Sequence, residues 1–392
     1  MKSTYGYIVL IIVMVMSIVS IPRLSMAQDS CSLKISLLTC GVGEELYASY
    51  GHSALRIQDK CKGTDIVYNY GTFNFGDPDF YSKFTRGKLP YYLNDENFLG
   101  FIQTYVQEGR SISEQVLRLD ATESKAIQHF LEENLKEENK YYRYDFLFDN
   151  CSTRIRDGFS KIFGEKIEWG HIMTNDSVSF RTILNHYERN LHWERFGINL
   201  LMSHQVDDKM KSEQAMFLPD YLAKGFDKAT LNGNKLVSET KEILVRQKPI
   251  EDKLNEPKLY LWLLLGFIFL LSQIKKVKPY LMYVDVLLFL LLGLLGCLML
   301  FMWFGTEHKV CAWNRNLLWA FPFHLVFAAL IPTGSEKVKK YAKYASWLLI
   351  LAVISNLIAD QKYMAEIFPL LILIYLRLGY YSKQVKYLSF SK

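Results

Sequence analysis

The sequence predicts a two-part protein, in which an exported α+β domain is followed by an all-α bundle of about five transmembrane helices. Three observations lead to this prediction. An apolar run near the N-terminus, residues 7–21, ends shortly before a small-residue motif. The stretch from about 28 to 255 is polar, charged and rich in Tyr and Phe. Residues 257–380, by contrast, are mostly Leu, Ile, Phe, Val and Met, and the length suffices for both a soluble core and a membrane domain.

The N-terminal segment has the features of a secretory signal peptide. A lysine precedes the apolar run, and Ser25 and Ala27 put small residues at the −3 and −1 positions of a cleavage site. We therefore assign residues 1–27 to a signal peptide. Arg23, between the apolar run and this site, leaves an uncleaved anchor as the alternative. In both cases the domain that follows is exported.

Residues 256–392 form the predicted transmembrane helical domain, which has five apolar segments separated by basic or polar ones. These segments are Leu259–Ile274, Tyr280–Phe304, Leu317–Ile331, Trp347–Ile358 and Ile367–Tyr380. If the first runs from outside to inside, every basic run falls on the cytoplasmic side, in keeping with the positive-inside rule. Residues 28–255 and the loop 305–316 then share the extracytoplasmic face of the inner membrane. The last two segments are short, and the alternative to two membrane crossings is that they form a re-entrant pair.

The charge and cysteine pattern argue against several classes of function. The net charge of +6 sits largely in short basic runs beside apolar segments, so it does not indicate a nucleic-acid-binding surface. The six cysteines form no C-x-x-C motif, which argues against a zinc ribbon or a thioredoxin-like site. The histidines of the soluble half lack metal-ligand spacing, so we expect no metal and no cofactor. Export permits disulfides, and Cys31 with Cys61 is the first pair to test.

The soluble half is predicted to mix strands and helices. Three runs are typical of β-strands, namely Leu33–Leu38, Ala54–Ile57 and Ile66–Tyr70. Asp120 and Glu123 form a capping box that predicts a helix reaching to about Asn139. Residues 170–255 are expected to be helical and loop-like.

Cys151 is the first candidate for chemistry. A second helix is expected to start at Asn150 or at Cys151 itself, after an aromatic segment, so the cysteine falls in the first helical turn. A thiol there feels the positive end of the helix dipole and unpaired backbone N–H groups, which favour the nucleophilic thiolate. The same N–H groups can stabilise an oxyanion on a substrate carbonyl. The alternative is a buried structural cysteine.

His52 is the candidate base. It follows a glycine at the head of a predicted strand, which puts an imidazole at a strand edge close to a tight backbone. Histidine is the usual base that activates a thiol. The next strand offers Asn69 as a third group to orient the imidazole, with Tyr68 and Tyr70 on the opposite face. The alternative is an ordinary histidine at a strand end.

A histidine on an early strand and Asn-Cys at a later helix start resemble the circularly permuted papain-like fold. That fold includes the NlpC/P60-related and lecithin:retinol acyltransferase-like enzymes. Five further stretches are Leu37–Tyr47, Tyr50–Ile57, Val67–Phe75, Tyr144–Arg154 and Thr306–Trp319. In this order they resemble the Bacteroidota-type lipoprotein N-acyltransferases, the Lnb family, over most of the chain. Residues 41–43 depart from the family pattern, which has a proline before the second glycine, and this concerns only local loop shape.

The resemblance implies a fold, a reaction and a set of site residues. The fold is an α+β permuted papain-like periplasmic domain at 28–255, followed by the membrane domain. The reaction moves an acyl chain from a phospholipid to the N-terminal amine of a diacylated lipoprotein. Cys151 is then the nucleophile that forms a thioester, His52 the base and Asn69 its partner. The substrate-binding residues expected nearby are Asn150, Ser53 and Arg56.

The loop 305–316 faces the soluble domain in this topology and supplies further candidates. His308, Asn314 and Asn316 are expected to bind a phospholipid headgroup, with interfacial anchoring of the loop as the alternative. Both substrates are lipids, so a catalytic domain tethered to a helical bundle meets them already concentrated in the membrane.

Two other functions stay open on the sequence. The first is a thiol hydrolase of cell-wall peptide or protein, which a polar cleft facing away from the bilayer favours. An apolar groove that opens toward the bilayer favours the acyltransferase instead. The second is a non-catalytic membrane sensor, for which Cys151→Ser leaves function intact.

Overall fold

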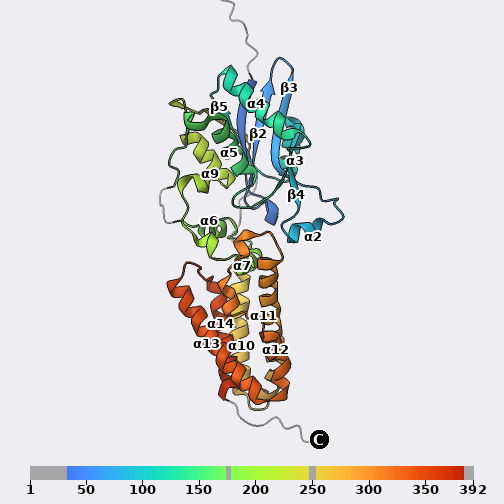
Figure 1. The fold of residues 1–392 in the computed structure, drawn as a ribbon, viewed down its shortest axis with the longest axis vertical. Coiled ribbons are helices and arrows are strands. Elements are labelled where there is room, and N and C mark those ends of the chain that lie inside the picture. The colour runs from blue at the N-terminus through green and yellow to red at the C-terminus, as the bar shows by residue number, and fades with distance from the viewer. Residues whose placement is uncertain (1–32, 174–177, 247–252, 384–392) are drawn as a thin grey trace, which may run out of the picture.

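The computed structural model describes residues 33–173, 178–246 and 253–383. Figure 1 shows an α+β domain standing on one end of an elongated helical bundle. The chain enters the bundle at α10 (Glu256–Gln273). This confirms the prediction of an α+β part followed by an all-α part.

A seven-stranded antiparallel sheet forms the centre of the α+β domain, in the order β10-β5-β1-β2-β3-β4-β6. Its strands are β1 (Leu33–Cys40), β2 (His52–Asp59), β3 (Thr64–Thr72), β4 (Pro90–Asn97), β5 (Ile112–Leu117), β6 (Tyr141–Arg143) and β10 (Val237–Leu244). A small second sheet joins β7 (Ile167–Glu168), β8 (Thr230–Leu231) and β9 (Asn234–Lys235).

Helices cover both faces of the large sheet (Figure 1). The helices of this domain are α2 (Phe80–Thr85), α3 (Phe98–Gln107), α4 (Ala121–Leu135), α5 (Cys151–Phe163), α6 (Phe180–Tyr187), α7 (His192–Leu201), α8 (Ser212–Ala215) and α9 (Pro219–Lys228), of which α2, α6 and α7 lie at the bundle end. Successive residues of a strand point to opposite faces, so Leu37 packs with α4, α5 and α9 whereas Leu38 packs with α3. Two cores on one sheet explain why β1 is buried along most of its length.

The orientation of the sheet decides which residues approach the bundle. The β2–β3 hairpin points away from the bundle, and α2, which follows β3, lies at the bundle end (Figure 1). The register of β1 and β2 pairs Leu33 with Asp59 at one end and Cys40 with His52 at the other. His52, at the start of β2, therefore lies at the end of the sheet that faces the bundle.

The three predicted strands are confirmed, each one or more residues longer than expected at one or both ends. The capping box of Asp120 and Glu123 is confirmed, although its helix ends at Leu135 rather than near Asn139. The prediction that residues 170–255 are only helical and loop-like is wrong for β10, which pairs with β5. Most positions of β10 are exposed and polar, as suits an edge strand, so no apolar alternation marked it.

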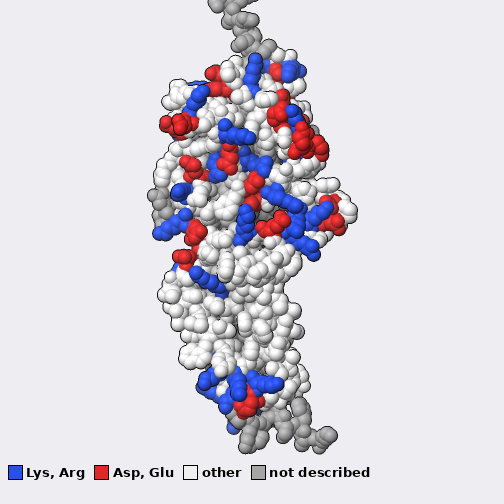
Figure 2. All heavy atoms as spheres, viewed as in Figure 1, with Lys and Arg blue, Asp and Glu red and all other residues white. Residues whose placement is uncertain are grey.

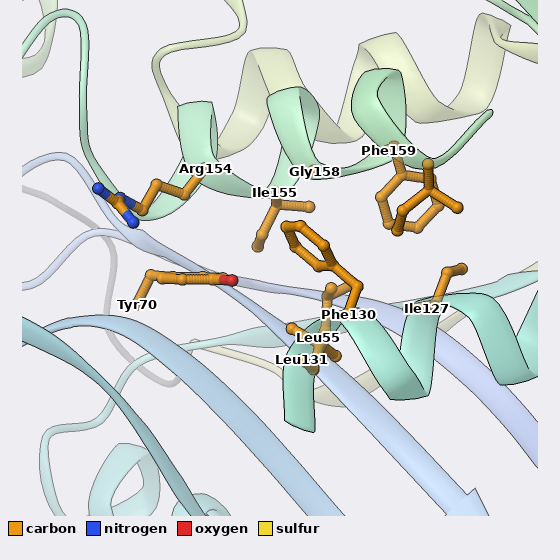
Figure 3. A pocket seen from close by; sticks show the side chains of 10 residues that line it. Leu55, Tyr70, Ile127, Phe130, Leu131, Arg154, Ile155, Gly158 and Phe159 are labelled. Carbon is orange, nitrogen blue, oxygen red and sulfur yellow. The ribbon is translucent and has the colours of Figure 1, made fainter. Parts of the chain in front are cut away.

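The core between α4 and α5 is closely packed. Figure 3 shows a small cavity there, with Leu55, Phe130 and Ile155 among its lining residues. Its volume is ≈ 10 Å³, which is no more than the space of a single water molecule. An acyl chain does not fit inside this core.

The bundle consists of α10, α11 (Leu281–Phe304), α12 (His324–Leu330), α13 (Glu336–Ile358) and α14 (Phe368–Lys383). Within the described residues, three helical segments are long and apolar enough to cross a membrane: Lys278–Phe304, Glu336–Ile358 and Ala365–Lys383. On the face seen in Figure 2, the middle of the bundle is uncharged and a group of charges lies at the end far from the α+β domain. Within the bundle, Arg377 forms an ion pair with buried Asp285 at 2.6 Å, a costly arrangement that requires both partners.

Two of the predicted spans need correction. Leu317–Ile331 is not one helix, because α12 covers only seven residues. Pro322 removes a backbone donor, and a Cβ on Gly296 would lie 2.1 Å from the Ala320 oxygen, so this segment packs as non-helical backbone against α11. The fourth helix starts at Glu336, eleven residues before the expected Trp347, because basic residues join its first turns.

Cys61 forms a disulfide, while Cys40, Cys151, Cys297 and Cys311 are free thiols. Cys31, the partner expected from the sequence, lies outside the described residues. A disulfide in the α+β domain agrees with an oxidising compartment.

Candidate active site

Helix α5 presents Cys151 as its first residue, as the sequence predicted. Asn150 caps the helix, because its side-chain oxygen accepts from the N–H groups of Ser152 and Thr153, both at 2.9 Å. The Asn150 amide also donates to the carbonyls of Phe146 and Phe217, so the capping residue is itself held in place. These bonds fix the thiol at the helix start. They also occupy two of the N–H groups that the sequence offered to a substrate oxyanion.

His52, Asn69 and Glu96 form a hydrogen-bonded chain across three neighbouring strands. The His52 Nε2 lies 3.2 Å from the Asn69 Oδ1, and the Asn69 amide donates to Glu96 at 2.8 Å. Because the Asn69 oxygen can only accept, the proton of the neutral imidazole sits on Nε2. Nδ1 is then the basic nitrogen left for the thiol. Nothing in the sequence marked Glu96, since β4 was not predicted.

The thiol and the imidazole shift each other's pKa. Burial raises the pKa of Cys151, but the charge and hydrogen bond of His52 and a hydrogen bond from the Ser53 backbone outweigh it, so the pKa falls below its usual 9.0. Burial lowers the pKa of His52, but the charge of Cys151 and hydrogen bonds to Cys151 and Asn69 raise it above 6.5 overall. The pair therefore favours thiolate and imidazolium, the reactive state of a thiol nucleophile.

Cys40 shows what the same residue type does without a base. It lies directly opposite His52 in the register of β1 and β2, yet its side chain is fully buried in the α3 core. Burial raises the pKa of this thiol to about 12. Cys151 differs because its thiol meets the His52 imidazole from the start of α5, whereas the Cys40 side chain lies in the α3 core.

Ser53 and Ser152 stand beside the thiol. Their hydroxyls are 3.0 Å apart, and the Ser152 oxygen is 3.9 Å from the Cys151 sulfur. Both serines are buried, so they are suited to positioning the sulfur more than to gripping a large substrate.

Aromatic hydroxyls complete the site, and the sequence did not separate them from core residues. A Cβ placed on Gly71 would lie 3.7 Å from the Tyr144 ring and 3.9 Å from both the Tyr142 hydroxyl and the Cys151 Cβ. Gly71 has a φ of +93°, and its missing Cβ leaves a space of about one methyl group between these side chains. Among the described residues, the buried Tyr142 hydroxyl has no hydrogen-bond partner. A buried donor that lacks a partner is costly unless a ligand satisfies it.

The other predicted substrate-binding residues lie away from the thiol. Arg56 is buried on β2, paired with Asp65 at 2.6 Å and with Glu114 at 3.0 Å. Its guanidinium also stacks on Phe98. These contacts hold the Arg56 side chain within the α3 core, so its guanidinium already has partners there.

The loop after α11 joins the two parts of the molecule. Asn314 and Asn316 are buried, and both donate to the Leu200 carbonyl at the end of α7, at 2.7 and 2.9 Å. The His308 ring lies 3.1 Å from the Thr85 carbonyl, next to Gly87. The three residues are thus brought to the α+β domain but not to Cys151. In the described ranges, no three metal-ligating side chains come together.

Two protein-family models match the chain. The Lnb N-terminal periplasmic domain matches residues 22–182, and the Lnb transmembrane domain matches residues 250–387. The chain belongs to the Lnb family. Searches of curated proteins and of solved structures found no match to it. Membership makes it a membrane protein with a periplasmic domain and suggests an enzyme of lipoprotein processing.

Proposed function

We propose that this Lnb-family protein is a phospholipid-dependent lipoprotein N-acyltransferase of the inner membrane. The observation that carries the proposal is the position of the thiol–imidazole pair. Cys151 and His52 lie at the end of the sheet that faces the bundle, among aromatic side chains, rather than in a polar cleft at the far end. A nucleophile for a lipid ester needs this position, whereas a hydrolase of cell-wall peptide gains nothing from it.

In the first step the Cys151 thiolate attacks the carbonyl carbon of a phospholipid ester. A C–S bond forms, and the carbonyl electrons move to oxygen as an oxyanion. When the tetrahedral intermediate collapses, the C–O bond to glycerol breaks and the His52 imidazolium protonates the leaving alkoxide. The products are a lysophospholipid and a Cys151 thioester, with a neutral imidazole.

In the second step the N-terminal amine of a diacylated lipoprotein attacks the thioester. The C–N bond forms, His52 takes a proton from the amine, and the thiolate leaves. The product is an amide, and the thiolate–imidazolium pair is regenerated. Asn69 and Glu96 orient the imidazole and favour its charged form in both steps.

We assign the Tyr142 hydroxyl as a donor to the oxyanion of both intermediates. It is buried, lacks a partner among the described residues and, like the Cys151 Cβ, lies 3.9 Å from the place that a Cβ on Gly71 would take. Asn150 already occupies the N–H groups of Ser152 and Thr153, and the Tyr142 hydroxyl would supply a donor in their place.

We further propose that α10 and the α12 segment cross the membrane with the three longer segments, giving five crossings. The basic turn between α10 and α11 and the basic start of α13 then face the cytoplasm. His308, Asn314 and Asn316 serve in this scheme to hold the periplasmic domain against the bundle.

Mass spectrometry of a reporter lipoprotein tests the proposal. The host lacks its own N-acyltransferase and carries the wild-type gene, its Cys151→Ser version or, as a matched thiol control, Cys297→Ser. We expect a third acyl chain on the N-terminal peptide with the wild type and Cys297→Ser, and none with Cys151→Ser. A peptide that stays diacylated with well-inserted wild-type protein refutes the acyltransferase, and peptide fragments released from cell wall would then favour the hydrolase.

A further inference from the structure

A row of aromatic rings runs from the thiol to the rim of the α+β domain. The Tyr144 ring stacks on Tyr91 with centroids 4.4 Å apart, and Tyr91 meets Phe73 edge-on at 5.2 Å. Phe73 stacks on Phe80 at 5.8 Å, and Phe80 stacks on Phe84 at 6.0 Å. Phe75 meets Phe73 edge-on at 4.6 Å and lies 5.2 Å from Phe80. We call these six residues the aromatic row. Each ring is within van der Waals reach of the next, so the row is a continuous apolar surface.

The inner end of the aromatic row touches the site. The Tyr144 ring and the Cys151 Cβ lie 3.7 and 3.9 Å from the same point above Gly71. Tyr144 is partly exposed, so one side of its ring is accessible next to the site.

The outer end of the aromatic row lies at the level where a membrane span ends. The Arg86 carbonyl, directly after α2, accepts from the Glu307 N–H at 2.9 Å, and His308 contacts Thr85. Glu307 is three residues beyond Phe304, the last residue of α11. Figure 1 shows α2 at the top of the bundle accordingly.

The aromatic side chains around α2 are too exposed for a soluble surface. Tyr81 is 83% exposed, Phe75 69% and Phe84 53%. A cluster of large apolar side chains in water is unfavourable and marks an interaction surface. At this height the available partner is the lipid of the outer leaflet, where aromatic side chains are enriched at the interface.

We propose that the aromatic row is the path along which one acyl chain of the donor phospholipid leaves the bilayer and reaches Cys151. This inference rests on the proposed function and adds the binding site for the lipid chain. The cavity of ≈ 10 Å³ between α4 and α5 is too small for an acyl chain, whereas the aromatic row is an apolar surface that ends next to Cys151. When the donor ester leaves the bilayer to reach Cys151, its acyl chain loses contacts with neighbouring lipids. The aromatic rings replace these contacts and keep the acyl chain out of water.

The test uses the full-length protein in nanodiscs of phosphatidylethanolamine and phosphatidylglycerol. Formation of the Cys151 acyl-enzyme is followed by intact-protein mass spectrometry with two donors, the nanodisc phospholipid and a water-soluble butyryl ester. The variants are Phe75→Ser and Phe84→Ser, which change exposed side chains and so preserve the fold. Leu99→Ser and Val106→Ser are matched controls, because both residues are exposed on α3, on the other face of the sheet.

We expect each row variant to slow acylation from phospholipid about tenfold, since part of the contact with the chain is lost, and to leave butyryl transfer unchanged. Both controls should behave as the wild type. Equal rates for row variants and controls overturn the inference, as does an equal loss with the soluble donor. If the wild type itself accepts nothing from phospholipid, the proposed function fails instead, so the two failures are distinguishable.

A second measurement does not depend on catalysis. Cys151→Ser protein is irradiated in nanodiscs that contain a phospholipid with a diazirine near the end of one acyl chain. Labelled peptides should include residues 73–84 or Tyr91. Labelling confined to the transmembrane helices overturns the inference.

Discussion

Two polar clusters of this protein contain similar residues and behave in opposite ways. One surrounds the start of α5, with His52, Asn69 and Cys151, and the other is the loop after α11, with Asn314 and Asn316. In the loop the amides donate to backbone carbonyls of α7 and are buried. At α5 the imidazole and thiol perturb each other, and the neighbouring Tyr142 hydroxyl has no partner among the described residues.

The difference separates a cluster that can react from one that only holds two domains together. The second cluster, formed by His308, Asn314 and Asn316, is called the joint. A polar group whose hydrogen bonds are completed inside the protein contributes stability and is not available to a substrate. A buried group that lies beside a nucleophile and lacks a partner, or whose charge is stabilised in an unusual state, can instead serve a substrate at a cost in stability. Changes at the first cluster should thus alter rate, and changes at the second should alter stability.

The largest effect is expected for His52→Ala, which should lower acyl transfer roughly a thousandfold because the base and proton donor are lost. The imidazolium holds the pKa of Cys151 below its usual 9.0, so iodoacetamide should still alkylate the wild-type thiol at pH values below 9.0. In His52→Ala the rise in alkylation should move to higher pH. Peptide mass spectrometry of Cys151 over a pH series measures the alkylation profiles of the wild type and of His52→Ala. His308→Ala is the control from the joint, and an unshifted profile in His52→Ala contradicts the pairing.

Tyr142→Phe should come next, with a loss on the order of a hundredfold in acyl transfer, because one oxyanion donor is removed. Thermal unfolding should show no loss of stability, since the hydroxyl makes no bond that would be missed. Tyr187→Phe removes a hydroxyl bound to exposed Asp220 and should leave the rate near that of the wild type. If Tyr142→Phe is slower only because it unfolds, Tyr142 has a structural role, like the residues of the joint, and is no oxyanion donor.

Asn316→Ala should cost about 2 kcal/mol of stability, because the buried Leu200 carbonyl and Trp319 indole N–H lose a partner. Denaturation of the detergent-solubilised protein measures this. Alkylation of Cys151 should keep the wild-type rate and pH profile in the fraction that stays folded. A shifted profile would mean that the loop reaches the site, contrary to the comparison.

The smallest effect is expected for Glu96→Gln, a few-fold loss in acyl transfer. Burial raises the pKa of Glu96, while the charge of His52 lowers it, so the carboxylate and the imidazolium stabilise each other. Without that charge the pKa of His52 should fall and the pH profile of acyl transfer should shift. Asp95→Asn, an exposed neighbour on β4, is the control. If both variants match the wild type, Glu96 does not contribute to catalysis and the hydrogen-bonded chain from His52 matters only as far as Asn69.

The sequence was sufficient where the signal is local. The capping box of Asp120 and the cap of Asn150 predicted two helix starts, since caps depend on residues within one turn. Asn69 could be placed opposite Tyr68 and Tyr70 because side chains alternate along a strand. The edge strand β10 gave no such signal, because its exposed polar residues resemble a loop.

By itself, the sequence determined the order of the parts and the membrane segment, and it singled out Cys151 and His52 as candidates, because helix caps, strand periodicity and hydropathy act over short distances. Only the tertiary structure decided that Glu96 completes the chain to His52, that Asn314 and Asn316 form a joint, and that Tyr142 and the aromatic row border the thiol. These relations depend on strand order and on the contact between the domain and its bundle. Residues distant along the chain meet there, and no local pattern records which polar group finds a partner.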